Sequence, residues 1–264
     1  MMWHDIKSIY RSSWSFAVAC PLLFLVPVIV EMAQHAAEVH IGMYIDIASA
    51  QAVEHAPLRM QFAVAKIVGL SLPSYWFIRY LAYGNDPKAA RRIEPVGFAL
   101  WAILFVASIS TSIYSLFGPP LGSVLGLEGL AGEWFGTALS VASTILGIYF
   151  TAWFVAWTLG KIRIGPLQSI TIMHGHFWRA IAYLAAGVIP LMIVHYAFAL
   201  GAIGRPEWLV WPILIVDSFV VGLLALTMTA PGWFAAKRAA DASNVELRGD
   251  REGLDVATVE PRKT

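Results

Sequence analysis

Long runs of apolar residues alternate with short polar segments along most of this chain. Six of the runs reach about 20 residues, which is enough for a helix to cross the roughly 30 Å of hydrocarbon in a lipid bilayer. A membrane barrel is excluded because its alternating strand pattern is absent, and lipid requires every backbone polar group to be paired. We therefore predict an all-α membrane protein with six spans, at residues 14–34, 60–80, 95–117, 134–159, 178–203 and 208–235.

The composition agrees with this prediction. The chain is 58% hydrophobic and 13% charged, whereas a soluble domain is nearer to half apolar and a quarter charged. The net charge of +1 gives no reason to expect nucleic acid as a partner. The single cysteine, Cys20, excludes an intramolecular disulfide and a cysteine-based metal site. Apolar sequence continues past Val30, so we interpret the first run as a span and not as a signal peptide.

Lysine and arginine are distributed unevenly between the segments that link the predicted spans. Arg59 and Arg205 fall on one side, Lys66 lies within a span, and the other fifteen basic residues fall on the opposite side. Basic flanks resist translocation and therefore collect on the cytoplasmic side. We expect a multi-pass protein of a bacterial inner membrane with both termini in the cytoplasm. The fifteen are Lys7, Arg11, Arg79, Lys88, Arg91, Arg92, Lys161, Arg163, Arg179, Lys237, Arg238, Arg248, Arg251, Arg262 and Lys263.

The segments outside the spans differ in character. Residues 1–13 predict an amphipathic lead-in on the inner leaflet, followed by a six-helix transmembrane domain over residues 14–236. Residues 36–59 are half apolar and predict a helix in the membrane interface. Residues 118–132 are rich in glycine and proline and predict a surface loop, with a shallow re-entrant turn as the alternative. Residues 237–264 are polar and predict a disordered cytoplasmic tail.

Two pairs of segments look like copies of each other. Residues 5–16 and 169–180 each combine a short amphipathic segment, called a ramp below, with a tryptophan at the start of the span that follows. Residues 73–79 and 231–238 each combine a proline, a tryptophan and a basic end. Because both pairs keep the same orientation, they suggest helical hairpins repeated in parallel. The alternative is that any span entering at the inner face selects tryptophan and arginine.

One of these ramps carries a family resemblance. Ile164-Gly165-Pro166-Leu167-Gln168-Ser169, continued by Gly175-His176-Phe177-Trp178-Arg179, is similar to a ramp in certain bacterial six-span proteins. Those proteins resemble the membrane region attached to some glycerophosphodiester phosphodiesterases. The resemblance covers two short stretches and implies six helices. The catalytic phosphodiesterase domain has no counterpart in this sequence, so no catalytic residue is carried over.

Apart from Arg79 and Arg179 at the inner ends, four charged or histidine residues lie inside the predicted spans. Glu31, Lys66, His195 and Asp217 all fall in the outer half of the bilayer if each residue advances a helix by about 1.5 Å. A charge at the membrane centre costs roughly 2.5–3.5 kcal/mol, so such groups usually face the bundle and find partners. We predict an ion pair between Lys66 and Asp217 that His195 can join. The simpler interpretation is a structural salt bridge, and the alternative is a site for a solute or a proton.

A second polar pattern concerns metal binding. Glu31, His35 and Glu38 lie at positions i, i+4 and i+7 on one helical face, which is a spacing that can ligate a divalent metal ion. The same stretch is where the first span emerges into water, and solvated polar residues are expected there. We therefore expect no metal and no cofactor, and keep these three residues as the alternative.

Small residues mark the third and fourth predicted spans. Small faces allow helix backbones to approach, and hydroxyl groups can bond across helices, so the two spans predict a tight hairpin. The alternative is a polar translocation path along residues 108–115. The small residues are Ser108, Thr111, Ser112 and Ser115 in the third span, and Gly136, Ser140, Ser143, Gly147 and Thr151 in the fourth.

No known catalytic signature is recognisable in the sequence, so we do not expect an enzyme. We expect an inner-membrane scaffold, assembly or envelope-maintenance protein. The alternative is a small-solute or proton-coupled carrier that uses Glu31, Lys66, His195 and Asp217. A carrier should have a water-filled cavity that reaches these residues, whereas a scaffold should have a closed core and exposed small or apolar seams. The expected partners are the lipid bilayer and either another membrane protein or a second copy.

Overall fold

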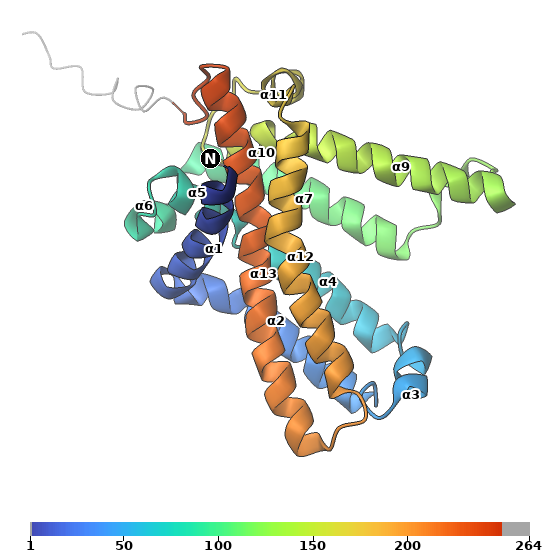
Figure 1. Cartoon of the computed structure of the whole chain (residues 1–264). Helices are drawn as coiled ribbons and strands as arrows, with labels where there is room; N and C mark the ends of the chain where they lie inside the picture. The colour runs from blue at the N-terminus through green and yellow to red at the C-terminus, as the bar shows by residue number, and fades with distance from the viewer. Residues whose placement is uncertain (1, 250–264) are drawn as a thin grey trace, which may run out of the picture.

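The computed structural model describes residues 2–249, and all regular secondary structure in this range is helical (Figure 1). This confirms the predicted all-α class. The helices in chain order are α1 (Met2–Ala19), α2 (Pro21–His40), α3 (Ile47–Ala52), α4 (Pro57–Ser71), α5 (Ser74–Ala82), α6 (Pro87–Arg91), α7 (Pro95–Phe117), α8 (Leu121–Val124), α9 (Gly129–Tyr149), α10 (Thr151–Thr158), α11 (Pro166–Met173), α12 (Phe177–Ala202) and α13 (Glu207–Ala242).

Four helices in the described part of the chain are long and apolar enough to cross a membrane: α2, α7, α12 and α13. α9 and α10 form a fifth such element if they are one span, bent by 48° between Tyr149 and Thr151. Several apolar helices of this length are the mark of a membrane protein. The third, fifth and sixth predicted spans correspond to α7, α12 and α13, with ends that differ by a few residues except at the longer α13.

The first two predicted spans are each divided by a proline. The chain breaks at Cys20, so that Pro21 opens α2, where its missing N–H leaves no hydrogen bond unmade. The first membrane-crossing helix is therefore α2. The predicted lead-in, residues 1–13, does not end at residue 13, because α1 continues without a break to Ala19. In the second span, Leu72 and Pro73 separate α4 from α5, and both pieces are shorter than a span. Six spans therefore stay a prediction.

The structure treats the suggested copies differently. Residues 5–16 lie within the continuous helix α1, whereas residues 169–180 include the end of α11, a turn at Gly175 and the start of α12. Pro73 ends a helix, but Pro231 lies inside the unbroken α13. The repeated hairpins are therefore not confirmed by these elements.

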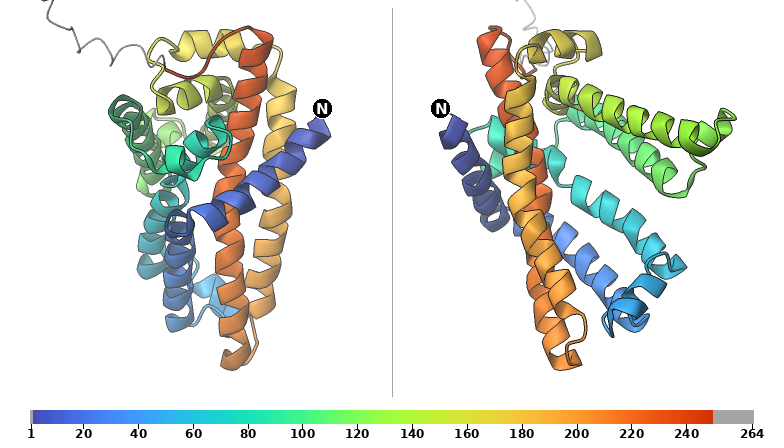
Figure 2. Two further views of the ribbon diagram at one scale, coloured as in Figure 1. Left: turned by 90° about the vertical axis from the view of Figure 1, so that its left-hand side faces the viewer. Right: turned by 45° about the vertical axis from the view of Figure 1, so that its right-hand side comes forward.

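α13 is the axis of the fold. It runs beside α12 along its length, and α1, α2, α5 and α10 also pack against it (Figures 1 and 2). Two glycines make this approach close: a Cβ atom on Gly187 of α12 would collide with the carbonyl oxygen of Thr227, and one on Gly222 of α13 would lie 2.5 Å from Val28 Cγ2. These contacts set α2 and α12 directly against α13.

Apolar side chains form two separate cores along this axis. The larger core lies toward the end where α1, α5, α10 and α11 gather, and it includes Phe16, Val28 and Leu226. The smaller core lies toward the opposite end and includes Tyr44 and Leu214. The stretches of α2 and α13 between the two cores carry polar residues, and these form the site described below.

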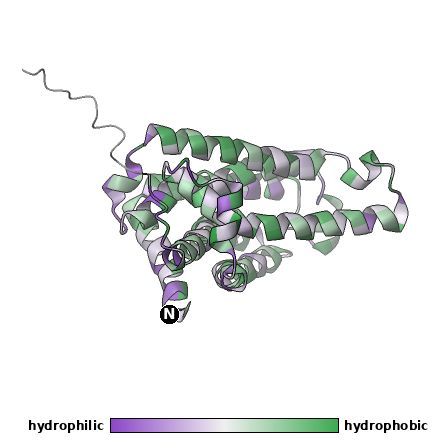
Figure 3. Ribbon diagram, turned by 90° about the horizontal axis from the view of Figure 1, so that it is seen from above, coloured by the Kyte–Doolittle hydropathy of each residue, from purple (hydrophilic) through white to green (hydrophobic). Residues whose placement is uncertain are grey.

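α7 and α9 extend sideways from the rest of the fold (Figures 1 and 2). They pack against each other only marginally, and the ribbon of the extended helices is coloured mostly as hydrophobic (Figure 3). The small residues of α9, such as Gly136, Ser140 and Ser143, are exposed. The prediction of a tight hairpin between the third and fourth spans is therefore wrong, because Ser108 and Ser112 of α7 and Ser143 of α9 line a cleft instead of packing against each other.

The connecting segments are partly helical, and the tail differs from expectation. Residues 36–59 contain the end of α2, the short helix α3 and the start of α4, and residues 118–132 contain the single turn α8 and the start of α9. The tail was expected to be disordered from Lys237, but α13 continues to Ala242, and Leu247 is buried in the larger core. Packing against the core orders this stretch. The rest of the predicted tail, residues 250–264, lies outside the described residues.

Candidate functional site

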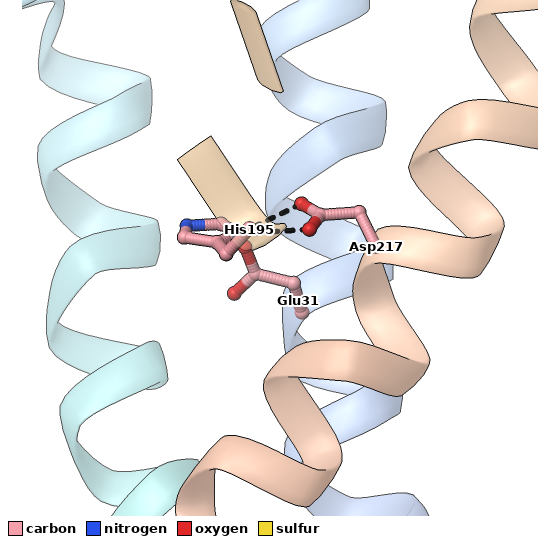
Figure 4. A group of neighbouring side chains, drawn as sticks. All are labelled: Glu31, His195 and Asp217. Atoms are coloured by element: carbon pink, nitrogen blue, oxygen red, sulfur yellow. Dashed lines mark hydrogen bonds and ion pairs between the residues drawn. The ribbon is translucent and has the colours of Figure 1, made fainter. Parts of the chain in front are cut away.

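The four ionisable residues predicted from the sequence come together between the two apolar cores. Glu31 on α2, His195 on α12 and Asp217 on α13 point toward one another (Figure 4). Lys66 on α4 reaches the same place and contacts Glu31. Glu31 and Asp217 have no exposed surface. We call this group, together with His35 and Glu38, the charged cluster.

Asp217 accepts hydrogen bonds from two histidines on different helices. His195 Nδ1 lies 2.9 Å and 2.8 Å from the two carboxylate oxygens of Asp217. His35 Nε2 lies 3.0 Å from Asp217 Oδ2. One carboxylate therefore links α13 to both α2 and α12. His35 was predicted only as an alternative metal ligand, and its i+4 spacing from Glu31 was the signal that it shares this face.

Lys66 pairs with Glu31 and not with Asp217. Its Nζ atom lies 2.8 Å from both carboxylate oxygens of Glu31. The predicted pair of Lys66 and Asp217 is wrong, because α4 packs mainly on α2 and scarcely on α13. Lys66 is therefore within reach of Glu31, whereas Asp217 is bonded to the two histidines.

Glu38 closes the side of the cluster nearest the smaller core. Its carboxylate accepts hydrogen bonds from Gln34 at 2.8 Å and from the Tyr44 hydroxyl at 2.7 Å, and it forms an ion pair with Arg59 at 3.0 Å. His35 Nδ1 lies 3.1 Å from Glu38 Oε2. The sequence analysis treated Glu38 as a solvated residue at a helix end, but its side chain is buried.

Both ring nitrogens of His35 face polar groups. Nδ1 faces the carboxylate of Glu38 and the Tyr44 hydroxyl, 3.0 Å away, and Nε2 faces the carboxylate of Asp217, with Glu31 Oε1 also 3.5 Å from Nε2. At Nε2 a nitrogen without a hydrogen would present a lone pair to carboxylate oxygens, whereas Nδ1 can also accept a hydrogen bond from Tyr44. With a doubly protonated His35, the three carboxylates of the cluster are balanced by His35, Lys66 and Arg59. Burial of unpaired charge is thereby avoided.

A second feature is the cleft between α7, α9–α10 and α12–α13, with a volume of about 910 Å³. Its walls are mainly apolar but carry hydroxyl groups from three sides. Ser108, Thr111 and Ser112 of α7 face Ser143 and Thr144 of α9 across it. The hydroxyls of Thr111, Ser112 and Thr144 each donate to a carbonyl of their own helix. Their oxygen lone pairs can still accept a hydrogen bond from a group in the cleft.

A third polar group joins α1 to α12 and to the C-terminal part of α13. Arg238 of α13 donates to both carboxylate oxygens of Asp5, at 2.6 Å and 3.0 Å, and Tyr183 of α12 donates at 2.6 Å. Burial raises the pKa of the Asp5 carboxyl, but the bonds from Arg238 and Tyr183 and the charge of Arg238 outweigh it. The pKa therefore lies below its ordinary value of 3.8. Sequence reasoning missed this group because its members are far apart in the chain.

No protein-family model, curated protein or solved structure matches the chain. The resemblance to the membrane region of glycerophosphodiester phosphodiesterases therefore stays a prediction.

Proposed function

We propose that this chain is a non-enzymatic assembly protein of a bacterial inner membrane, which holds a transmembrane helix of a partner protein in the cleft. The observation that carries this proposal is the cleft of about 910 Å³ between α7, α9–α10 and α12–α13. α7 and α9 are apolar helices with few buried residues. A membrane-spanning helix of the partner would cover their exposed small faces.

The lining of the cleft suits a helix. In lipid, helices associate through close backbone packing and through hydroxyl groups that bond across the interface. Gly147 and Ser143 give α9 a small face, and a Cβ atom on Gly147 would meet nothing within 4 Å. Ser108 and Ser112 supply hydroxyls on the opposite wall. We expect the partner helix to present glycine, alanine, serine or threonine at a spacing of four residues.

The charged cluster fits an assembly role because it holds helices together. It links α2, α4, α12 and α13, and Glu31, Asp217, His35 and Glu38 are buried with their charges compensated. A closed cluster beside an exposed seam is what a scaffold is expected to have. Removal of one charge should loosen the four-helix unit from which α7 and α9 extend.

The orientation of the chain follows from the basic residues. The start of α1 and the end of α13 lie at the same end of the fold, where Asp5 meets Arg238. α6, which carries Lys88 and Arg91, lies nearer that end, while Arg59 donates to the carbonyl of Glu54 just after α3, nearer the other end. We propose that the end with α1 and α6 is cytoplasmic, because short basic segments are retained there.

The test compares two substitutions on α9. Ser143→Leu fills the cleft, whereas Val141→Leu places a similar side chain on an exposed position that does not line it. Proteins crosslinked in cells through a photoreactive residue at Thr144 would be purified and identified by mass spectrometry. We expect one membrane protein to be crosslinked in the wild type and in Val141→Leu, and lost in Ser143→Leu. Equal crosslinking in all three, or crosslinking to lipid alone, would contradict the proposal.

A proton-coupled carrier is the second candidate, and one observation favours it. Glu31, Lys66, His195 and Asp217 form a single group in which the His35 ring lies between two carboxylates, as a proton relay requires. The purified protein would be placed in vesicles that contain a pH-sensitive dye, and a pH gradient would be imposed. A carrier should dissipate the gradient, and Asp217→Asn should abolish this. If vesicles with the wild-type protein lose the pH gradient no faster than empty vesicles, proton movement by the protein alone is excluded.

A further inference from the structure

The charged cluster has the donor atoms and the geometry of a metal site. Glu31, His195 and Asp217 each offer one ligand atom, and these three atoms all lie within 4.8 Å of one another. They come from α2, α12 and α13, so that three helices converge on one point (Figure 4). His35 adds a fourth ligand atom, Nε2, on the same side of α2 as Glu31.

Three of the distances between these atoms approach those of a tetrahedral site. Zinc binds histidine nitrogen and carboxylate oxygen at about 2.0–2.2 Å, which separates neighbouring ligand atoms by roughly 3.3–3.6 Å. His35 Nε2 lies 3.5 Å from Glu31 Oε1 and 3.0 Å from Asp217 Oδ2, and His195 Nδ1 lies 2.8 Å from Asp217 Oδ2. Small side-chain movements would therefore bring all four atoms onto one ion.

An outer layer of hydrogen bonds orients His35 for this role. Histidines that bind metals usually donate their other ring N–H to a carboxylate, which fixes the ring and raises its basicity. His35 Nδ1 lies 3.1 Å from Glu38 Oε2, and Glu38 is itself held by Gln34, Tyr44 and Arg59. Glu38 thus orients the His35 ring and does not itself bind the ion. The alternative metal site predicted from the sequence, Glu31, His35 and Glu38, had included Glu38 as a ligand.

The charges are consistent with a divalent cation. Nε2 of His35 faces the carboxylates of Glu31 and Asp217, and this position requires either a proton or a metal ion. A divalent ion would neutralise the two carboxylates. Lys66 competes for Glu31, but it can keep one carboxylate oxygen of Glu31 while the other binds the ion.

We propose that Glu31, His35, His195 and Asp217 bind a divalent transition-metal ion, with zinc as the ion that best suits two imidazoles and two carboxylates in a four-ligand site. The ion ties α2, α12 and α13 together at the level between the two apolar cores. This site is independent of the assembly role, since it predicts a bound ion whether or not a partner occupies the cleft.

The experiment uses the full chain purified in detergent. The protein is treated with a chelator, dialysed and mixed with Zn²⁺ at a concentration equal to its own, and bound metal is measured by mass spectrometry after gel filtration. We expect one zinc ion per chain and a higher melting temperature. Asp217→Asn and His195→Gln should each remove the ion, while Glu38→Gln should weaken binding by about 10–100-fold. The matched controls, His40→Gln and Glu128→Gln, change exposed residues and should bind as the wild type does.

Cobalt provides a second readout that does not depend on stability. Co²⁺ in a tetrahedral site of nitrogen and oxygen ligands absorbs visible light strongly, whereas Co²⁺ on surface groups does not. We expect this absorption in the wild type and in His40→Gln, and its loss in His195→Gln, a change that leaves Asp217 and His35 in contact and should keep the fold. Substoichiometric Zn²⁺ in the wild type, or equal Zn²⁺ and Co²⁺ binding in His195→Gln and Asp217→Asn, would overturn the proposal.

Discussion

Lys66→Ala should destabilise the protein far more than removal of Lys66 and its partner together. Glu31 is fully buried, and Lys66 Nζ lies 2.8 Å from both of its carboxylate oxygens. Removing one member of a buried ion pair costs about 3–5 kcal/mol. We therefore expect the free energy of unfolding to fall by about 3–5 kcal/mol.

The assay is thermal melting of the purified protein in detergent at neutral pH. For a chain of this size each kcal/mol lowers the melting temperature by about 2–4 °C, so Lys66→Ala should melt roughly 6–20 °C below the wild type. The double variant Glu31→Gln with Lys66→Met removes both charges and should melt close to the wild type. Lys237→Ala is the control, because its pair with Asp241 is half exposed and contributes less than about 1 kcal/mol.

Three results would refute this reasoning. A melting temperature of Lys66→Ala equal to that of the wild type would mean that Glu31 finds another cation or is solvated. A double variant that melts at or below the temperature of the single variant would mean that the charges stabilise the fold beyond compensating each other. A drop in Lys237→Ala equal to that in Lys66→Ala would show that burial does not decide the effect.

Three further predictions concern packing, pH and orientation. Gly222→Leu should lower the free energy of unfolding by about 1–3 kcal/mol through overpacking, because a Cβ atom there would lie 2.5 Å from Val28 Cγ2. Gly136→Leu is the control and should melt at the wild-type temperature, because a Cβ atom at Gly136 meets nothing within 4 Å. The stability that Asp5 contributes should be complete above pH 3.8, its ordinary pKa, and be lost as the pH falls through its lower folded pKa; melting curves of Asp5→Asn should lack this drop. In a cysteine-free background, Ser123→Cys should react with an impermeant thiol reagent in intact cells and Lys88→Cys only after lysis; the reverse pattern would overturn the orientation.

Much of the fold follows from the sequence because the apolar runs are long. The lengths of α7, α12 and α13 are set by continuous hydrophobic sequence, and periodicity finds them directly. The breaks at Cys20 and Pro73 were missed because proline is tolerated inside membrane helices, as Pro231 shows within α13. The direction taken by α7 and α9 depends on packing between distant segments, and a hydropathy pattern carries no information on it.

The site was predictable in its members but not in its pairing. Glu31, Lys66, His195 and Asp217 stand out because ionisable residues are rare inside spans, and the structure gathers all four. Which carboxylate meets Lys66 depends on the neighbour of α4, and the sequence does not state that α2 lies between α4 and α13. Glu38 was interpreted as solvated because the fold of residues 41–59, which brings Tyr44 and Arg59 over it, could not be foreseen.

Solid-state NMR in lipid bilayers tests most directly whether α2, α12 and α13 are joined through the buried carboxylate of Asp217. The protein would carry ¹⁵N in histidine and ¹³C in the aspartate carboxyl group, with His195→Gln, His35→Gln and Asp217→Asn to assign the signals. The structure predicts strong dipolar coupling of the Asp217 carboxyl carbon to both His195 Nδ1 and His35 Nε2, whose distances to Asp217 Oδ2 are 2.8 Å and 3.0 Å. An Asp217 signal that couples to neither histidine would contradict the account.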